Sequence, residues 1–505
     1  MDTAAATAHA ELTPVRRNLI LLMVVLATTL YGTTLLVVST ILPQMQGSFA
    51  ATTDEIAWAM TFNILATAIV TPMSGWLAGR FGTRRVMVWS LGGFTLATFM
   101  CGSAESLEGL VFWRIMQGGF GAPSTPLTQS ILLTVFPREQ QTRVMGIFGF
   151  GVVLGPIFGP ALGGIMAESY NWRWAFYALV PVGIAATVGL QAVLPSDKDS
   201  TDRPLDWIGF LALSIALAAT QLVLARGQRL DWFDSYEIII ATFVAIIGFW
   251  IFVTHCLTSP RPFLDPRLLL DRNYTLGIIL VTIYGMLNFT PMVLLPPLLT
   301  GPAGYTDSLV GYVVGARGVG GCIGFLVAGF AGRLDGRILM MVGFAMLLVA
   351  GLWLMHIDLN VTYIDLAMNA GLQGIAIGLI WVPLTTATFA TLKPEQMGEA
   401  SAVYHLLRNL GSSFFISVCV AEIIRSTGMN YAHLAELLTP YNRALDMPAV
   451  LGRWDPDSLK GLASLSKEMT RQATLIAYLN AFGLFSTAFA LTLPLVLFMR
   501  TRKPR

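Results

Sequence analysis

The chain contains 505 residues, of which 55% are hydrophobic and only 12% are charged. Soluble domains carry about a quarter of their residues as charges, so this composition excludes an ordinary soluble protein. The formal net charge of +2 argues against a nucleic-acid-binding protein, which would show a concentrated basic face.

Apolar runs of about 20 residues recur from end to end, and each is long enough to cross a hydrocarbon core of about 30 Å. Since backbone polar groups cannot be left bare in lipid, these runs must be helices. The first run is too long for the apolar region of a cleavable signal peptide. The pattern predicts an all-α membrane protein with fourteen transmembrane helices, near residues 18–42, 55–78, 86–104, 109–135, 142–167, 174–194, 206–225, 237–257, 273–298, 308–331, 338–356, 361–390, 398–424 and 474–498.

Basic residues gather in every second loop. Placing the N-terminus inside puts Arg16, Arg84, Arg143 and Arg337 on one side, and the basic C-terminal tail joins them if the number of spans is even. The positive-inside rule makes this side cytoplasmic. We therefore expect a multi-pass protein of the cell inner membrane with both termini in the cytoplasm.

Two parts of the chain repeat each other. AGRFGTR at residues 78–84 matches AGRLDGR at 331–337, and Gln117-Gly118 matches Gln373-Gly374 about 256 residues later. Two six-helix halves in parallel register explain this pattern, and transporters built on that plan bind substrate between the halves. Chance similarity of glycine-rich helices is the alternative. The predicted divisions are a cytoplasmic tail at 1–17, an N-terminal half at 18–200, a two-helix insert at 201–260, a C-terminal half at 261–498 with a periplasmic loop at 428–473, and a cytoplasmic tail at 499–505.

The loop GWLAGRFGTRR joins the second and third spans. Gly75 and Gly82 permit a tight turn and a close approach of helices. Arg84 and Arg85 can bind the C-terminal end of a helix, or carboxylates of a neighbouring helix, and so stabilise one conformation. The alternative is that these arginines only anchor the topology.

The fourth span carries Arg114 within apolar sequence, with Gln117 one turn further on the same face and Gly118 next to it. An arginine at membrane depth costs about 2.5–3.5 kcal/mol and is usually retained for a transport pathway or a partner. Two interpretations stay open: Arg114 takes part in coupling, or it holds helices together through backbone carbonyl groups.

The fifth span, GVVLGPIFGPALGG, has a glycine at every fourth position, so its glycines form one smooth helix face. Two prolines remove backbone donors and bend the helix. A smooth, bent face suits helices that move against each other, whereas tight packing without motion is the alternative. The residues concerned are Gly151, Gly155, Gly159 and Gly163 with Pro156 and Pro160.

These three motifs, in this order, resemble the major facilitator superfamily. The runs WRWAF at Trp172–Phe176, GARGVGG at Gly315–Gly321 (which contains Arg317) and RNLGSSF at Arg408–Phe414 resemble its fourteen-span drug:proton antiporter branch. The resemblance covers nearly the whole chain and implies export of lipophilic compounds driven by proton entry. In Gram-negative members it also implies a periplasmic adaptor and an outer-membrane channel. We expect adaptor contact at 428–473, unless that segment is only a surface cap.

The chain departs from this family where protons are expected to bind. The family's acidic residues in the first and last spans correspond to Thr34 and Ala481, so two membrane-depth carboxylates are absent. Arginine does not release protons near neutral pH, whereas histidine changes charge there. We therefore expect His405, one turn before Arg408 on the same helix face, to accept the proton, unless it is only a hydrogen-bonded interior residue or a drug contact. The further candidates for proton coupling are Arg114 and Glu399.

Loosely packed walls rich in methionine and aromatic residues suit varied lipophilic cargo. Polar and aromatic residues within the spans are therefore candidates for the substrate cavity, although such residues more often belong to a core. The candidates are Thr34, Asn63, Gln129, Tyr284, Asn288 and Trp381.

These observations favour a secondary active exporter of amphipathic small molecules that works by proton antiport and alternating access. The main alternative is a facilitator or a specialised exporter of a lipid, siderophore or metabolite, with altered or absent coupling; a non-transporting scaffold or sensor is a third. The sequence shows no nucleophile–base pair, phosphate-binding loop or metal cluster, so we expect no enzyme activity, metal or cofactor. The expected partners are a lipophilic substrate, protons, membrane lipid and the adaptor and channel, but no nucleic acid.

Overall fold

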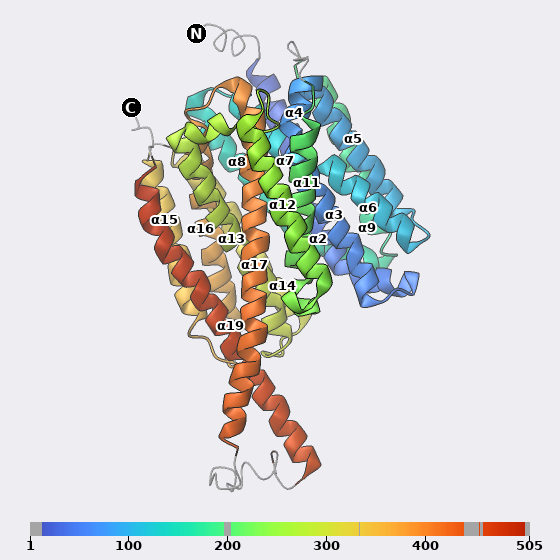
Figure 1. Ribbon diagram of the computed structural model, residues 1–505, viewed down its shortest axis with the longest axis vertical. Coiled ribbons are helices and arrows are strands. Elements are labelled where there is room, and N and C mark those ends of the chain that lie inside the picture. Colours follow the sequence, from blue (N-terminus) through green and yellow to red (C-terminus); the bar gives the residue numbers. More distant parts are fainter. Residues whose placement is uncertain (1–12, 196–203, 333, 439–453, 455–457, 500–505) are drawn as a thin grey trace.

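The computed structural model describes residues 13–195, 204–332, 334–438, 454 and 458–499, and this part of the chain consists of helices and their connections, without a strand (Figure 1). The first group of helices is α2 (Pro14–Phe49), α3 (Thr53–Val70), α4 (Met73–Phe81), α5 (Thr83–Gly102), α6 (Leu107–Gly121), α7 (Ser124–Val135), α8 (Arg138–Ser169), α9 (Trp174–Tyr177) and α10 (Val180–Val193). A hairpin follows, made of α11 (Trp207–Arg226), the short helices η1 (Gly227–Leu230) and η2 (Trp232–Asp234), and α12 (Tyr236–Thr258). The second group is η3 (Pro266–Leu270), α13 (Arg272–Thr300), α14 (Asp307–Phe330), α15 (Gly336–Leu354), α16 (Tyr363–Phe389), η4 (Pro394–Gln396), α17 (Met397–Glu436) and α19 (Leu459–Leu497).

The prediction of an all-α membrane protein is confirmed. Among the described residues, 11 helices are long and apolar enough to cross a membrane, or up to 12 if the bent pair α3–α4 forms one span. The two other predicted spans correspond to α5, which carries Arg84 and Arg85 in its first turn, and to α6–α7, which is divided into helices of 15 and 12 residues. Basic residues and a broken helix weaken the apolar signal at these two places, so the total of fourteen stays a prediction.

Proline explains where the spans break. The axis bends by 56° between α3 and α4, where Pro72 follows Thr71, and α6 gives way to α7 at Pro123. A proline removes a backbone donor and crowds the preceding turn, so kinks at these positions are expected. In contrast, α8 continues for 32 residues although it contains Pro156 and Pro160.

The glycines of α8 pack against α2 within the first group. A Cβ atom at Gly155 would lie 2.7 Å from the Thr29 carbonyl oxygen, and one at Gly159 would lie 2.8 Å from the Thr33 carbonyl oxygen. Such distances leave no room for a side chain, so the two backbones are in direct contact, as in other tightly packed membrane helices. The position of α8 is therefore fixed by α2 on one side.

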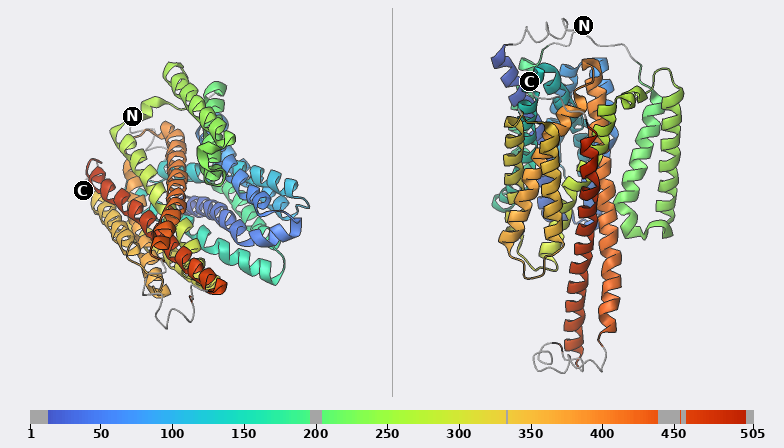
Figure 2. Two further views of the ribbon diagram at one scale, coloured as in Figure 1. Left: turned by 60° about the horizontal axis from the view of Figure 1, so that its bottom comes forward. Right: turned by 90° about the vertical axis from the view of Figure 1, so that its left-hand side faces the viewer.

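The hairpin α11–α12 lies beside the main bundle, as Figure 2 shows. Its inner helix α11 packs against α3 and α17, one helix from each group. The outer helix α12 exposes large apolar side chains, including Trp250 at 71% and Phe243 at 62%. Apolar exposure of this kind suits a helix that faces lipid.

The segment predicted as a periplasmic loop is largely helical at both ends. Helices α17 and α19 continue past the rest of the bundle and project together as a pair (Figure 1). Tyr431 and Ser466 join the pair through a hydrogen bond of 3.0 Å between their hydroxyls. The central part of the predicted loop, residues 439–453 and 455–457, lies outside the described residues. The beginning of α2 and the end of α19 both lie at the end of the bundle opposite to this projection, which requires an even number of crossings.

Candidate functional site

The first group of helices contains a buried network centred on Arg114 of α6. The Arg114 side chain is 1% exposed; its Nε donates to the Ala59 carbonyl at 3.0 Å, and its guanidinium also donates to Gln117. Gln117 donates to the Thr98 hydroxyl at 2.7 Å, and Asn63 donates to the Arg114 carbonyl at 2.7 Å. The network joins α3, α5 and α6, and each of its partners is electrically neutral.

The second group contains a similar network centred on Arg317 of α14. Arg317 is 8% exposed and donates to Gln373 of α16 and to the carbonyl oxygen of Asn288 of α13. Gln373 donates to Asn369 at 2.7 Å, and Asn369 donates to the Ala350 carbonyl at 2.9 Å. This network joins α13, α14, α15 and α16, again without a carboxylate.

The two networks are related by the internal repeat, but they draw their arginine from different helices. A Cβ atom at Gly118 would lie 2.3 Å from the Asn63 carbonyl oxygen, and one at Gly374 would lie 2.0 Å from the Arg317 carbonyl oxygen. Asn63 and Arg317 therefore occupy equivalent places. The arginine comes from α6 in the first group and from α14, the equivalent of α3, in the second.

A polar contact crosses between the two groups at their centre. His405 of α17 lies 1% exposed, with its Nε2 2.5 Å from Oε1 of Gln129 of α7, and Ser401 donates to the Pro126 carbonyl at 2.9 Å. An amide oxygen can only accept, so Nε2 of His405 is the donor, and the neutral ring keeps its lone pair on Nδ1. That Nδ1 and Nε2 of Gln129 are buried and have no hydrogen-bond partner in the described part of the chain. Two predicted site residues thus meet across the boundary.

The two groups also touch at the end of the bundle where α2 begins. A Cβ atom at Gly75 of α4 would lie 2.7 Å from the Cα of Glu399 of α17, and Glu399 accepts a hydrogen bond from the Asp265 backbone. At the same end, the Arg143 guanidinium of α8 lies 5.6 Å from the ring centre of Phe330 of α14. These contacts close the structure on this side.

Helix α8 carries most of the remaining contact between the groups. The face opposite to α2 meets α14, where a Cβ atom at Gly146 would lie 2.7 Å from the Gly329 Cα. Further along, Phe148 of α8 and Trp381 of α16 have ring centres 5.4 Å apart. Helix α8 therefore has backbone contact with α2 on one face, and both backbone and aromatic contact with the second group on the other, so it forms the shared wall between the two groups.

Arg408 lies one turn beyond His405 on α17, within electrostatic range of tyrosines from both groups. The side chain is half-buried, and its guanidinium donates to Asn409 of the same helix, at 3.1 and 3.3 Å. Tyr31 of α2, and Tyr284 and Tyr404 of the second group, lie close enough to Arg408 to interact with it electrostatically. Of these, Tyr284 was a predicted cavity residue, whereas Tyr31 and Tyr404 were not identified from the sequence.

The remaining sequence candidates are placed as follows. Thr34 is 2% exposed and donates to the Leu30 carbonyl of its own helix at 2.8 Å, and Ala481 is fully buried in α19. Gly82 has φ of 91°, a left-handed value that favours glycine, between α4 and α5. Arg84 donates to the Gln191 carbonyl near the C-terminal end of α10. None of these four positions places a carboxylate in the membrane interior.

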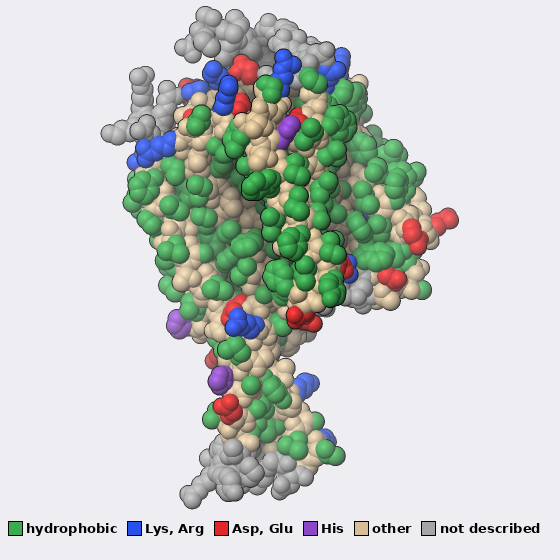
Figure 3. Space-filling view, viewed as in Figure 1, with side chains coloured by type: hydrophobic (Ala, Val, Ile, Leu, Met, Phe, Trp, Pro, Cys, Tyr) green, Lys and Arg blue, Asp and Glu red, His purple; other side chains and the backbone are tan. Residues whose placement is uncertain are grey.

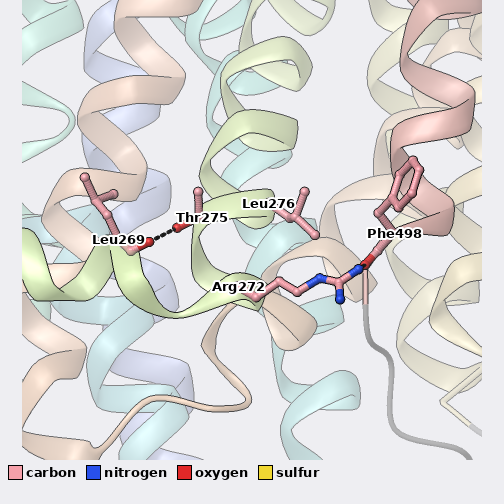
Figure 4. A pocket seen from close by; sticks show the side chains of 5 residues that line it. All are labelled: Leu269, Arg272, Thr275, Leu276 and Phe498. Carbon is pink, nitrogen blue, oxygen red and sulfur yellow. Dashed lines mark hydrogen bonds between the residues drawn. The ribbon is translucent and has the colours of Figure 1, made fainter.

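A shallow depression lies away from this centre, at the start of α13 (Figure 4). Arg272 reaches across it to the Phe498 carbonyl at 3.4 Å, and Thr275 donates to the Leu269 carbonyl at 2.6 Å. The lining is mostly apolar and open to the surroundings. All of its lining residues come from the second group, so this depression does not lie at the contact between the two groups.

Comparisons with known proteins agree with this arrangement. Residues 24–416 match the family model described as Major Facilitator Superfamily. Multidrug export protein EmrB of Escherichia coli (strain K12) is 31% identical over 463 residues, which cover 91% of this chain and 90% of that protein. Fatty acid resistance protein FarB of Neisseria gonorrhoeae is 28% identical over 457 residues, covering 90% of each chain. The structure of the human organic anion transporter MFSD10 superposes with a TM-score of 0.60 at 13% identity, covering 95% of this chain and 100% of that one.

Proposed function

Because this chain belongs to the major facilitator superfamily, we propose that it is a secondary transporter that exports amphipathic small molecules by alternating access. The observation that carries this proposal is the contact between Gln129 and His405. It joins the two halves of the molecule through one buried hydrogen bond and leaves two buried polar atoms without partners. Buried polar atoms without partners are costly, so this pair is suited to a contact that forms in one conformation and is exchanged for another partner in the next.

The names of the relatives support export as the direction of transport. Several similar proteins are multidrug export or resistance proteins at about 30% identity over most of the chain. Such relatives favour the drug:proton antiporter branch and a broad range of amphipathic substrates. They also favour the inner membrane as the location.

The distribution of charge supports an orientation with both termini in the cytoplasm. Lysine and arginine side chains gather at the end of the bundle where α2 begins, and apolar side chains cover the middle (Figure 3). The positive-inside rule assigns that end to the cytoplasm. The contacts of Gly75 with Glu399 and of Arg143 with Phe330 then close the cytoplasmic side, which corresponds to an outward-facing conformation.

Proton antiport is the expected coupling, with His405 as its site. The unpartnered Nδ1 of His405 can take a proton, and the ring would then carry a positive charge one turn from Arg408. Repulsion between these two cations would disfavour the arrangement in which both are enclosed. Proton binding would thus have different free energies in the two conformations, which is the requirement for a ligand to shift their populations.

A facilitator with altered or absent coupling is the second candidate function. No aspartate or glutamate is buried among the described residues, and the family positions for acidic groups hold Thr34 and Ala481. Histidine alone must then replace two carboxylates. This observation favours a transporter whose driving force is not only the proton gradient.

The projecting ends of α17 and α19 are the proposed contact for a periplasmic adaptor that leads to an outer-membrane channel. They extend past the bundle on the side opposite to the beginning of α2 (Figure 1). Arg471 anchors the base of the projection by donating to the Pro302 carbonyl at 2.6 Å. The alternative is a surface cap without a partner.

Transport by purified protein in liposomes tests the proposal. Substrate-dependent proton movement in the wild type, abolished in His405→Ala while substrate binding persists, would support antiport at His405. Substrate movement without proton movement would instead support the facilitator. A wild-type protein that moves none of a broad panel of amphipathic compounds would overturn the export function.

A further inference from the structure

The two helices of the α11–α12 hairpin form one unit. A Cβ atom at Gly248 of α12 would lie 3.0 Å from the Cβ of Ala216 of α11, so the helices are in close contact there. At the end where α11 begins, Nε2 of His255 lies 2.8 Å from Oδ1 of Asp206. Close packing in the middle and this pair at one end favour a hairpin that moves as a single body.

Asp206 also connects the hairpin to the linker at residues 259–271, which leads to α13. Its side chain is only 12% exposed, and its carboxylate accepts hydrogen bonds from the backbone nitrogens of Gly209 at 3.1 Å and Phe263 at 2.9 Å. Hydrogen bonds to a carboxylate are about twice as strong as those between neutral groups. Two residues further along, the Asp265 backbone donates to Glu399 of α17. The linker is therefore bonded both to the hairpin and to the second group.

Helix α11 is itself hydrogen-bonded to α17. The Gln221 amide donates to the Ser413 hydroxyl, and the Ser417 hydroxyl donates to the Leu224 carbonyl, both at 3.2 Å. Because a hydrogen bond requires a narrow range of distances and angles, these bonds hold α11 in one register against α17. The hairpin is thus joined to the second group by hydrogen bonds at its linker and along α11.

The contact of the hairpin with the first group is apolar. Met73 and Trp76 of α4 pack against a cluster that includes Leu213 and Leu217 of α11 and Phe263 of the linker. Among the described residues, the hydrogen bonds that leave the hairpin go to the linker and to α17, and none goes to α3 or α4. Since apolar attraction is non-directional, surfaces joined in this way can shift past each other without breaking a hydrogen bond.

We infer that the hairpin moves with the second group during transport and slides over α3 and α4 of the first group, with Asp206 as the positioning residue that fixes it. This inference rests on the proposed alternating-access mechanism. Opening the end of the bundle where α2 begins requires α4 to leave α17, because Gly75 and Glu399 are in backbone contact there. Helix α11 then stays with α17, and its apolar contact with α4 is the contact that changes.

Distances between spin labels show which group the hairpin follows. One label is attached through Leu257→Cys on α12, and the other through Trp89→Cys in the first group or Ile338→Cys in the second; all three side chains are exposed. The four native cysteines are replaced with alanine. Each distance is measured with and without Gly75→Val, whose added side chain would overlap the Glu399 backbone and prevent closure. We expect Gly75→Val to shift the distance between residues 257 and 89 and to leave that between residues 257 and 338 unchanged.

Reversible cross-linking shows whether transport requires the sliding. In the same cysteine-free background, Gln221→Cys with Ser413→Cys allows a thiol reagent to join α11 to α17, and Met73→Cys with Leu217→Cys allows it to join α4 to α11. Transport in proteoliposomes is followed with the amphipathic compound that the wild type moves fastest. We expect the first cross-link to leave transport intact and the second to abolish it until the reagent is removed by reduction.

A variant of Asp206 tests its positioning role. Asp206→Ala removes the hydrogen bonds from Gly209, His255 and Phe263, so the distance between residues 257 and 338 should become broadly distributed and transport should fall several-fold. Glu237→Ala is the matched control, because it removes a carboxylate from an exposed ion pair at the other end of the hairpin, and it should change neither quantity. A residue that only stabilised the fold would lower the melting temperature without broadening this distance.

The outcomes separate the inference from the function on which it rests. If Gly75→Val shifts the distance between residues 257 and 338 and not that between residues 257 and 89, the hairpin belongs to the first group and the inference is wrong. Full transport with α4 cross-linked to α11, or a distance that stays sharp in Asp206→Ala, would also overturn it. A wild-type protein that transports none of the amphipathic compounds would overturn the export function, whereas the spin-label distances would still decide which group the hairpin follows.

Discussion

Gly75 of α4 and Glu399 of α17 meet at the end of the bundle where α2 begins, so closely that a Cβ atom at residue 75 would lie 2.7 Å from the Glu399 Cα. The neighbouring atoms are backbone and cannot turn away. This contact joins the two halves on the side that carries the basic residues. A single methyl group added at residue 75 would therefore keep the two halves from closing on that side.

Replacing Gly75 with valine should therefore prevent closure at this end. We expect transport to fall about tenfold or more, since a closed state disfavoured by about 1.4 kcal/mol is populated tenfold less. The accessibility of a cysteine introduced next to residue 399 should rise in Gly75→Val. Gly47→Val is the control, because no heavy atom lies within 4 Å of a Cβ atom at Gly47. Normal transport by Gly75→Val would show that the contact is not required.

Much of this architecture could be predicted from the sequence, and the reasons are physical. Apolar length identifies helices directly, and the glycine spacing of α8 identifies a smooth face because each glycine removes a side chain. The repeat of Gln117-Gly118 at Gln373-Gly374 identifies equivalent helices. A broken or charged span is harder to identify. Helix α5 carries two arginines in its first turn, and the span α6–α7 is divided into two helices that are each too short to cross a membrane alone.

The internal connections of the site could not be predicted in the same way. When the two halves are aligned on their repeated motifs, the position equivalent to Arg114 is an alanine. The alignment therefore gives no indication that the arginine of the second network is Arg317, on a different helix. Gln129 and His405, which form a hydrogen bond, are 276 residues apart in the sequence. Their contact depends on how two helices cross, which local sequence does not show. Tyr31 and Tyr404 were missed because a tyrosine within a span has no local pattern that distinguishes a site from a core.

The buried network around Gln117 should contribute to stability more than to transport specificity. Gln117→Leu would remove one hydrogen-bond partner from Arg114 and one from the Thr98 hydroxyl. Removing one partner of a buried hydrogen bond costs about 1–3 kcal/mol, and more where a charge is involved. The melting temperature in detergent should therefore fall in Gln117→Leu and in its equivalent, Gln373→Leu.

Gln221→Leu provides the comparison for that experiment. Gln221 is only half-buried and makes a single hydrogen bond of 3.2 Å to the Ser413 hydroxyl. Its loss should lower the melting temperature less than the loss of Gln117. Equal effects of the two substitutions would mean that the Arg114 network is not a main source of stability.

The glycines of α8 that face α2 should not tolerate substitution, whereas Gly164, which does not face α2, should tolerate it. A methyl group at Gly155 would overlap the Thr29 carbonyl at 2.7 Å, whereas a Cβ atom at Gly164 would meet no heavy atom within 4 Å. Overpacking in a close-packed interior costs about 1–3 kcal/mol. We expect Gly155→Ala to lower the melting temperature and Gly164→Ala to leave it unchanged, and a reversed order would contradict the observed packing.

The pH dependence of transport should depend on His405. Histidine is the side chain whose charge ordinarily changes between pH 5 and pH 8, and here its Nδ1 is the free acceptor. Wild-type transport should therefore vary with pH across this range, and His405→Gln, which keeps a polar amide opposite Gln129, should transport with a flat profile. An unchanged pH profile in His405→Gln would exclude His405 as the proton site.

The projecting ends of α17 and α19 should matter in cells and not in liposomes. Replacing residues 431–470 with a short Gly/Ser linker removes the hydrogen bond between Tyr431 and Ser466 but leaves the His405–Gln129 contact in place. If the projection binds an adaptor, transport by the purified variant should equal that of the wild type, while resistance to exported compounds in cells should be lost. Crosslinking from a photoreactive group at residue 433, which is exposed near the tip, would identify the partner. Full resistance in cells with the shortened protein would instead show that the projection is a surface cap.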